Sequence, residues 1–458
     1  MPLMSVTISY DQDSKLQISG LTCECPCEHN TPAQDIYVGT GLIPQLPSYI
    51  AKKNLGTNCV LVCDKNTYEI AGRDVETTLK QAGFNVILCK IMRDGDVDPD
   101  ETAVGEVLLS IQPETEFLIC VGSGSLTDTT RVNATRTKLP FVSVGTAPSM
   151  DGYTSVVAPL LLKGVKIHRA GVCPEIIVCD IDVLRTAPLS MVAGGVGDVL
   201  GKYIAKADWK IGNIINDEPY CDVCGEIVTD AVNKLVDNAE EIASRTEKGI
   251  QILIEALLLA GVTIMIVGNT RAVASVEHNI AHYWDMVQLT RGNQPPKHGS
   301  SVGVATLLVW PIFQRFAKED LSRLDLADIR ARSISREDRV KWMLKTYGEE
   351  GGVTIMEENE GDFLTWEEQE RRIKRAQDRF ADIRAVIEEL PSYDRILNAM
   401  KVLQAHLTPE EEGIDEELLN ISMHCAKDYR TRYTLFKTLD ECGLLEEYLK
   451  GYPLPEGY

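Results

Sequence analysis

The chain has 458 residues, with 68 acidic residues against 46 Lys and Arg, so its formal charge is -22. A surface that acidic repels nucleic-acid phosphates and argues against a nucleic-acid-binding role. The length predicts two large domains, and a hydrophobic content of 44% argues against wholesale disorder.

The N-terminal segment lacks the basic start and apolar run of a signal peptide, and most of the 13 cysteines are isolated. This cysteine usage indicates reduced thiols and a cytoplasmic protein. Cys23, Cys25, Cys27 and His29 lie close together, but their spacing is irregular for a zinc site. The spacing therefore favours a solvated loop with free thiols over a structural metal.

Short apolar runs alternate with helix-like segments in the first part of the chain. Such runs are typical of parallel strands that are covered on both faces. The alternation predicts an α/β fold with a doubly wound parallel sheet. The expected strands are Asp35–Gly41, Asn58–Asp64, Asn85–Lys90, Thr115–Val121, Pro140–Val144 and Glu175–Asp180.

A glycine-rich turn, VGSGSLTDTTR, follows the fourth expected strand and precedes a helix expected to begin near Leu126. Gly122 and Gly124 would let the backbone approach a phosphate, and the N–H groups of the helix would favour its charge. A tight turn without a ligand is the alternative. Asp64, at the end of an earlier strand, either binds a ribose hydroxyl or begins a turn.

After Thr186 long amphipathic stretches replace the β-rich runs, which predicts a mainly helical second domain. We therefore expect a nucleotide-binding α/β domain over residues 1–186 and a helical domain over residues 187–458. The apolar stretch from Ile252 to Gly268 is interrupted by Glu255 and is short for a membrane span. It is predicted to be a buried helix that runs into a strand.

Three histidines, His278, His282 and His298, lie close together in the second half. The first two are spaced i,i+4 and share one helix face, whereas His298 is expected in a proline-glycine loop. Asp198 is expected to follow a glycine turn and to open the first helix of the second domain. Two imidazoles and a carboxylate leave open positions on a divalent ion, as a catalytic site requires. Considered without the other residues, a pair of histidines at i,i+4 is also compatible with an exposed surface or a buried core position.

The segments VGTAPSMDGYTS, GGVGDVLGKYIAKADW, VGNTR, EHNIAHYWDM and KHGSSVGVATLL follow one another in this order. Together they resemble bacterial-type sn-glycerol-1-phosphate dehydrogenases. The superfamily of these enzymes includes iron-type alcohol dehydrogenases, glycerol dehydrogenase and dehydroquinate synthase. The similarity extends nearly from end to end. Asn279 and Thr127 depart from the pattern of the family. These departures remove none of the expected metal ligands but change the expected shape of the substrate pocket.

The resemblance implies a dehydroquinate synthase-like fold, with a Rossmann-like domain, a helical domain and an active site between them. It implies that a zinc or nickel ion is bound, that the protein is a homodimer, and that NAD or NADP is the cofactor. The implied metal ligands are Asp198, His278 and His298. The implied cofactor-binding residues are Asp64, Gly122, Ser123, Gly124, Ser125, Asp128, Thr146 and Ser149.

The implied reaction is the reduction of dihydroxyacetone phosphate, a small phosphorylated ketone, to sn-glycerol 1-phosphate. Asp151 would bind substrate hydroxyls, His282 would relay a proton, and Lys202 and Arg271 are candidates for the phosphate. The alternatives are a dehydrogenase of another alcohol or polyol, or a lyase of the dehydroquinate synthase type. A binding protein that has lost catalysis is a third alternative.

Overall fold

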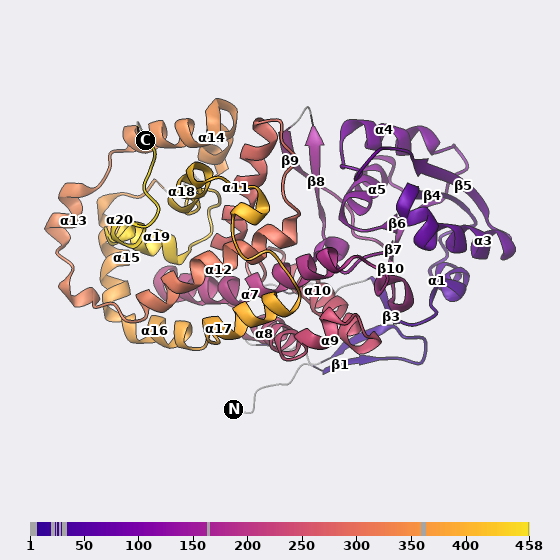
Figure 1. Ribbon diagram of the computed structural model, residues 1–458, viewed down its shortest axis with the longest axis horizontal. Helices are drawn as coiled ribbons and strands as arrows, with labels where there is room; N and C mark the ends of the chain where they lie inside the picture. Colours follow the sequence, from indigo (N-terminus) through magenta and orange to yellow (C-terminus); the bar gives the residue numbers. More distant parts are fainter. Residues whose placement is uncertain are drawn as a thin grey trace.

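The computed structural model describes residues 7–19, 23, 25–26, 29, 34–162, 165–358, 363–456 and 458. A six-stranded sheet forms the first part, drawn at the right of Figure 1. All its strand pairs are parallel, which confirms the predicted fold class. In spatial order the strands are β3 (Asp35–Gly39), β10 (Ile176–Asp180), β7 (Phe141–Gly145), β6 (Phe117–Gly122), β4 (Asn58–Asp64) and β5 (Asn85–Ile91).

The continuous apolar runs of the central strands are explained by burial on both faces of the sheet. In β4, Leu61 faces one hydrophobic cluster while Val60 and Val62 face another, as the two-residue period of a strand requires. Helices α1 (Leu46–Lys53) and α3 (Arg73–Gln81) cover the first face. Helices α4 (Glu101–Ser110) and α5 (Gly124–Thr137) cover the second. The segments η1 (Ile43–Gln45), α2 (Lys65–Thr67) and η2 (Tyr68–Gly72) connect them.

Two antiparallel hairpins were not predicted. β1 (Thr7–Tyr10) pairs with β2 (Leu16–Ser19), and β8 (Val157–Leu162) pairs with β9 (Val165–Ala170). In the second hairpin, β8 contacts α5 and β9 contacts α11 (Val276–Thr290), so this hairpin joins the sheet side to the helical side (Figure 1).

The second part is helical within the described residues, as predicted. The chain enters it through α6 (Ile181–Leu184). The helices that follow are α7 (Leu189–Asn216), α8 (Asp222–Asp237), α9 (Ala239–Ala243), α10 (Glu247–Val267), α11, α12 (His298–Phe316), α13 (Leu326–Arg332), α14 (Arg336–Glu358), α15 (Trp366–Asp378), α16 (Phe380–Glu388), α17 (Tyr393–Val402), α18 (Glu416–Cys425), α19 (Leu435–Glu441) and α20 (Leu445–Tyr448). Short turns of 3-10 helix are η3 (Gly152–Thr154), η4 (Leu321–Arg323) and η6 (Glu410–Glu412).

Helix α10 is long and apolar enough to cross a membrane, but 78% of its most apolar window is buried within the protein. It packs against α7, α8 and α9, so it is a core helix. The predicted strand at its end is wrong, because the helix continues to Val267. Gly268, at a positive φ of 71°, then caps it.

Helices α7 and α12 cross at unusually close range because glycines line their contact. A Cβ atom on Gly197 would lie 2.3 Å from the carbonyl oxygen of Gly299, and one on Gly299 would lie 2.1 Å from that of Gly194. The glycines around Asp198 therefore belong to the helix interior. The predicted glycine turn before Asp198 is wrong, since α7 begins at Leu189. The close contact brings Asp198 next to the start of α12.

The sheet and the helical part share one hydrophobic core. Ile36 on β3 and Ile177 on β10 lie in the same cluster as Val196 on α7 and Leu257 on α10. Side chains of β3 and β10, at one end of the strand order, are thus covered by α10 and by α7, and α7 also carries residues of the site described below. Such burial of apolar side chains fixes the two parts relative to each other.

A buried carboxylate on α7 gives the stability of the protein a pH dependence. Burial raises the pKa of Asp208 to about 7, against the hydrogen bonds that it accepts from Ser275 and Leu435. The folded state therefore keeps a proton on Asp208 at pH values at which the unfolded chain has already released it. Binding of this proton stabilises the folded state at acid pH, and this contribution to the free energy of unfolding is lost as pH rises through about 7. We expect Asp208→Asn to gain stability relative to wild type, on the order of 2 kcal/mol, between about pH 5 and about pH 8. Urea unfolding at both pH values measures this, and an equal difference at the two values would contradict it.

Candidate functional site

Three helices bring one carboxylate and two imidazoles together. Asp198 lies within α7, His278 lies in the first turn of α11, and His298 is the first residue of α12. One ligand atom from each lies within 4.8 Å of the others. The predicted loop position of His298 is wrong: Pro295 and Pro296 precede a helix that begins at the histidine itself.

The carboxylate of Asp198 is fully buried and is held by two neighbouring groups. Its Oδ1 lies 2.5 Å from the Nζ of Lys202, one helical turn away, and its Oδ2 accepts a 3.1 Å hydrogen bond from the backbone of Asp151. Burial by itself would raise the pKa of Asp198, but the Lys202 ammonium and the contact with His278 hold that pKa well below its usual value. Asp198 is therefore a carboxylate near neutral pH.

His278 is oriented by the residue beside it in the chain. Its Nδ1 lies 2.6 Å from the Oε1 of Glu277, while its Nε2 lies 3.5 Å from the Oδ1 of Asp198. Burial lowers the pKa of His278, but these two carboxylates outweigh burial and raise it. A carboxylate on one ring nitrogen that leaves the other pointing at the ligand cluster is the usual arrangement for a metal-binding histidine.

His282 lies one turn further along α11, against the same cluster. Its ring stacks on that of His298 at a centroid distance of 5.2 Å and also contacts the rings of His168 and Tyr429. Its Nδ1 is 3.9 Å from the Oδ2 of Asp285. His282, Asp285 and His298 form a second group of potential ligands that shares His298 with the first group.

The glycine-rich turn lies where the strand order of the sheet reverses. The chain passes from β4 outward to β5 and then returns to the other side of β4 to form β6. Asp64 ends β4 and Gly122 ends β6, so both lie at the carboxyl edge beside this reversal. This edge is the usual ligand-binding position in an open α/β sheet. Helix α5 begins at Gly124, two residues before the predicted start.

The other predicted cofactor residues line the same edge or lie just behind it. The hydroxyls of Ser123 and Ser149 are 2.7 Å apart, and the backbone N–H of Thr146 donates to the carbonyl of Gly122. Ser125 lies in the first turn of α5. Two carboxylates have protein partners: Asp128 pairs with the buried Arg131, and Asp64 caps α2 by accepting from the backbone of Thr67.

Lys202 and Asp151 belong to the site, whereas Arg271 does not. The Nζ of Lys202 lies 2.8 Å from the Oδ2 of Asp151. Arg271 instead forms an ion pair with Glu218 and contacts the α7 backbone beside Gly212. The carbonyl oxygen of Asp208, which accepts from Arg271, belongs to a residue 10 positions beyond Asp198 in the same helix, which corresponds to about 15 Å along its axis. The two cations that the sequence suggested for the phosphate therefore have different partners: Lys202 pairs with Asp151 and Asp198, and Arg271 pairs with Glu218.

Sequence reasoning missed four residues at the site: Glu277, Asp285, His168 and Tyr429. Glu277 precedes a predicted ligand, but adjacent helical residues point about 100° apart, so spacing gave no reason to pair them. His168 comes from the hairpin that was not predicted, and Tyr429 comes from a segment far along the chain. Only the folded arrangement relates these residues to the histidines.

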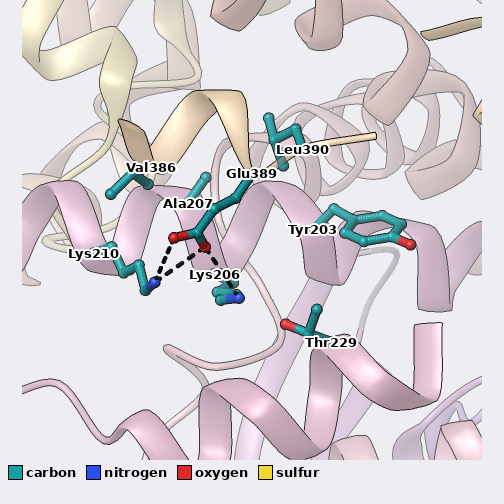
Figure 2. A pocket seen from close by; sticks show the side chains of 8 residues that line it. All are labelled: Tyr203, Lys206, Ala207, Lys210, Thr229, Val386, Glu389 and Leu390. Atoms are coloured by element: carbon teal, nitrogen blue, oxygen red, sulfur yellow. Dashed lines mark hydrogen bonds and ion pairs between the residues drawn. The ribbon is translucent and has the colours of Figure 1, made fainter. Parts of the chain in front are cut away.

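A shallow pocket lies beside a different face of α7, against α8 and α16 (Figure 2). Its polar lining is an ion-pair cluster in which Glu389 contacts Lys206 at 3.4 Å and Lys210 at 3.1 Å. Burial and the neighbouring Lys210 lower the pKa of Lys206, and Glu389 opposes them. Because both cations are already paired and the lining holds no potential metal ligand set, the candidate site is the cluster around Asp198.

Comparisons with known proteins support one family. A family model described as iron-containing alcohol dehydrogenase matches residues 37–188. A glycerol-1-phosphate dehydrogenase [NAD(P)+] from Geobacillus thermodenitrificans is 32% identical over 434 residues, which are 94% of this chain and 98% of the relative. A protein of the same name from Halalkalibacterium halodurans is 36% identical over 302 residues, 65% of this chain and 75% of that protein.

Solved structures share the fold at low sequence identity. The glycerol dehydrogenase of Schizosaccharomyces pombe matches with a TM-score of 0.58 and 16% identity, over 94% of this chain and 93% of that one. An iron-containing alcohol dehydrogenase from Corynebacterium glutamicum matches with a TM-score of 0.60 and 13% identity, over 95% and 98% of the two chains. These likenesses concern the arrangement of a parallel sheet followed by a helical part.

Proposed function

Because this chain belongs to the glycerol-1-phosphate dehydrogenase family of the iron-containing alcohol dehydrogenases, we propose that it reduces dihydroxyacetone phosphate to sn-glycerol 1-phosphate with NADH or NADPH. The observation that carries this proposal is the meeting of Asp198, His278 and His298 at one point. A buried carboxylate and two imidazoles fit a divalent ion that keeps open positions for a substrate oxygen.

The residues around these three also fit a metal ion. Glu277 occupies the Nδ1 of His278 and leaves its Nε2 toward Asp198, which fixes the ring for ligation. We propose that Asp198, His278 and His298 hold zinc or nickel. A divalent ion bound there supplies Lewis-acid polarisation of the ketone oxygen and stabilises the charge that develops on it.

We infer that Asp151 binds a substrate hydroxyl and that Lys202 positions Asp151. The side chain of Asp151 is partly exposed, whereas that of Lys202 is fully enclosed between Asp151 and Asp198. An ammonium buried between two carboxylates stays paired with them, because breaking these ion pairs would leave a buried charge without compensation. Lys202 therefore fits this positioning role better than direct contact with the substrate phosphate.

His282 is the proposed source of the proton that completes the alcohol. Its ring is only partly buried and lies against His298, and its Nδ1 faces Asp285. The Nε2 of His282 is the atom that we propose passes the proton, with solvent restoring it. Reduced nicotinamide supplies the hydride.

We propose that the turn from Gly122 to Ser125 binds the cofactor pyrophosphate at the N-terminus of α5, with Asp64 near the ribose. A Cβ atom on Gly124 would lie 3.6 Å from Met150, an ordinary contact distance, so the protein itself tolerates a side chain there. Gly124→Ala is therefore expected to raise the KM for the dinucleotide about tenfold or more without lowering the melting temperature. A lower melting temperature with an unchanged KM would contradict the role of this turn.

The function is tested by following NADH and NADPH oxidation with dihydroxyacetone phosphate, using protein stripped of metal and then given zinc or nickel. Oxidation that requires the metal supports the proposal and reveals the preferred nucleotide. Turnover only with unphosphorylated ketones would favour the alternative of another alcohol dehydrogenase. Binding of metal and nucleotide without any net oxidation would favour a lyase of the dehydroquinate synthase type. We further propose a homodimeric state, as the sequence resemblance implies, and a cytoplasmic location, as the cysteine usage indicates.

A further inference from the structure

A second group of metal-binding side chains lies at the start of α8, and the proposed reaction does not use it. Cys23, Cys25 and His29 come from the N-terminal segment, and Cys221 is the residue that caps α8. One ligand atom from each of the four lies within 4.8 Å of the others. The remaining cysteine of the segment, Cys27, lies outside the described residues.

The distances within this group fit ligation of one ion. The sulfurs of Cys23 and Cys25 are 3.0 Å apart, those of Cys23 and Cys221 are 3.8 Å apart, and the Nε2 of His29 is 3.4 Å from the sulfur of Cys25. A disulfide would need about 2.05 Å between sulfurs. Sulfurs bound at about 2.3 Å to a tetrahedral ion lie about 3.8 Å from one another. The Cys23–Cys221 distance has this value, and the Cys23–Cys25 distance lies between that of a disulfide and that of two ligands. With one ligand atom of each residue within 4.8 Å of the others, the four groups are close enough to surround a common centre.

The start of α8 suits a negatively charged ligand. The backbone N–H of Cys224 donates to the sulfur of Cys221 at 3.4 Å. Helix α8 has 16 residues, and the positive end of its dipole favours a thiolate at this position. The irregular C-x-C-x-C-x-H spacing argues against a zinc site when it is considered alone. The sequence pattern does not reveal the fourth ligand, Cys221, which is 198 positions from Cys23.

We propose that Cys23, Cys25, His29 and Cys221 bind one zinc ion that fastens the N-terminal segment to α8. Three thiolates and an imidazole complete a tetrahedral shell, so the ion has no open position and its role is structural. Zinc is favoured because thiolates select soft or borderline ions and tetrahedral geometry suits a d¹⁰ ion. This proposal is independent of the proposed dehydrogenase activity.

Cobalt substitution in the full chain tests the proposal, because thiolate ligands give cobalt a charge-transfer absorption in the near ultraviolet that oxygen and imidazole ligands do not. Reduced, metal-stripped wild type is expected to bind two Co²⁺ ions per chain, one at each proposed site, and to develop this absorption from the ion bound by the thiolates. Cys221→Ser and Cys25→Ser should each lose it. His278→Ala should keep it, since that substitution removes only a ligand of the proposed active-site ion.

Cys224→Ser is the matched control, because Cys224 lies in the first turn of α8 but outside the group of four. It is expected to keep the cobalt absorption. With zinc, elemental analysis should find one ion fewer per chain in Cys221→Ser than in wild type. Circular dichroism verifies folding, and Cys25→Ser, at a partly exposed position, carries the test if Cys221→Ser does not fold.

Three results would overturn the proposal. The first is wild-type protein with reduced thiols that binds cobalt without the thiolate absorption. The second is an absorption that survives both Cys25→Ser and Cys221→Ser. The third is a disulfide between Cys23 and Cys25, found by mass spectrometry of protein purified without reductant, that persists when zinc is supplied under reducing conditions. None of these readouts depends on dehydrogenase turnover, so failure here is distinguishable from failure of the proposed function.

Discussion

Replacing His278 by Ala is expected to lower kcat/KM for the reduction of dihydroxyacetone phosphate about 1000-fold, equivalent to about 4 kcal/mol of transition-state stabilisation. The physical reason is loss of one of three ligands, so that the ion no longer polarises the ketone. Because Glu277 contacts the ring of His278 and also accepts from the backbone N–H of Ser275, the substitution also removes one of the two contacts of that buried carboxylate. Steady-state kinetics and elemental analysis of the same preparation measure both effects, and one metal ion per chain should be lost relative to wild type.

Asp285→Asn is the control for this experiment. Asp285 belongs to the second group of potential ligands, with His282 and His298, but not to the group that contains Asp198. The variant is expected to retain the metal ion at Asp198, His278 and His298. If Asp285→Asn loses the ion while His278→Ala keeps it, the metal lies in the second group and the proposed ligand set is wrong.

The second large effect is expected from a single methyl group at the crossing of α7 and α12. In Gly299→Ala the added carbon would lie 2.1 Å from the backbone carbonyl of Gly194, which no side-chain rotation can relieve. The helices must move apart, at a cost of about 1–3 kcal/mol in the free energy of unfolding. Because His298 is the adjacent residue, the metal affinity should fall as well, by about tenfold or more. Urea unfolding and competition with a chelator measure these two quantities.

Gly105→Ala in α4 separates this clash from a general effect of replacing a helical glycine. A Cβ atom at Gly105 would meet nothing within 4 Å, so the substitution should stabilise the protein by about 0.5–1 kcal/mol through a lower backbone entropy of the unfolded chain. Equal stability changes in the two variants would show that the helices do not need a glycine at position 299.

The sheet could be predicted from sequence because its strands carry an unambiguous signal. Continuous apolar runs such as Asn58–Asp64 occur where both faces are covered, and all six runs form strands of one parallel sheet. The β8–β9 hairpin gave no comparable signal. Its first strand is apolar (VAPLLL) but contains Pro159, which argues against a central strand, and its second strand contains polar residues such as His168 and Arg169.

At the site, local sequence patterns identified the functional residues but not the secondary structure in which they lie. The glycines around Asp198 were interpreted as a turn, because conformational freedom and close helix packing both select glycine and the sequence cannot distinguish them. Likewise, Pro-Pro before His298 suggested a loop, although proline is also favoured at the beginning of a helix. Contacts across long separations, such as that of Cys23 with Cys221, lie beyond any local pattern.

The core shared by the sheet and the helices limits how the chain can be divided. Ile36 and Ile177 are buried against α7 and α10, so a fragment that ended near residue 186 would expose this apolar surface to water. Such a fragment is expected to aggregate instead of folding autonomously. The intact chain, for the same reason, should melt in one calorimetric transition, because neither part keeps its own interior sealed once the other has unfolded. Although two architectures are visible, we expect them to unfold as a single cooperative unit.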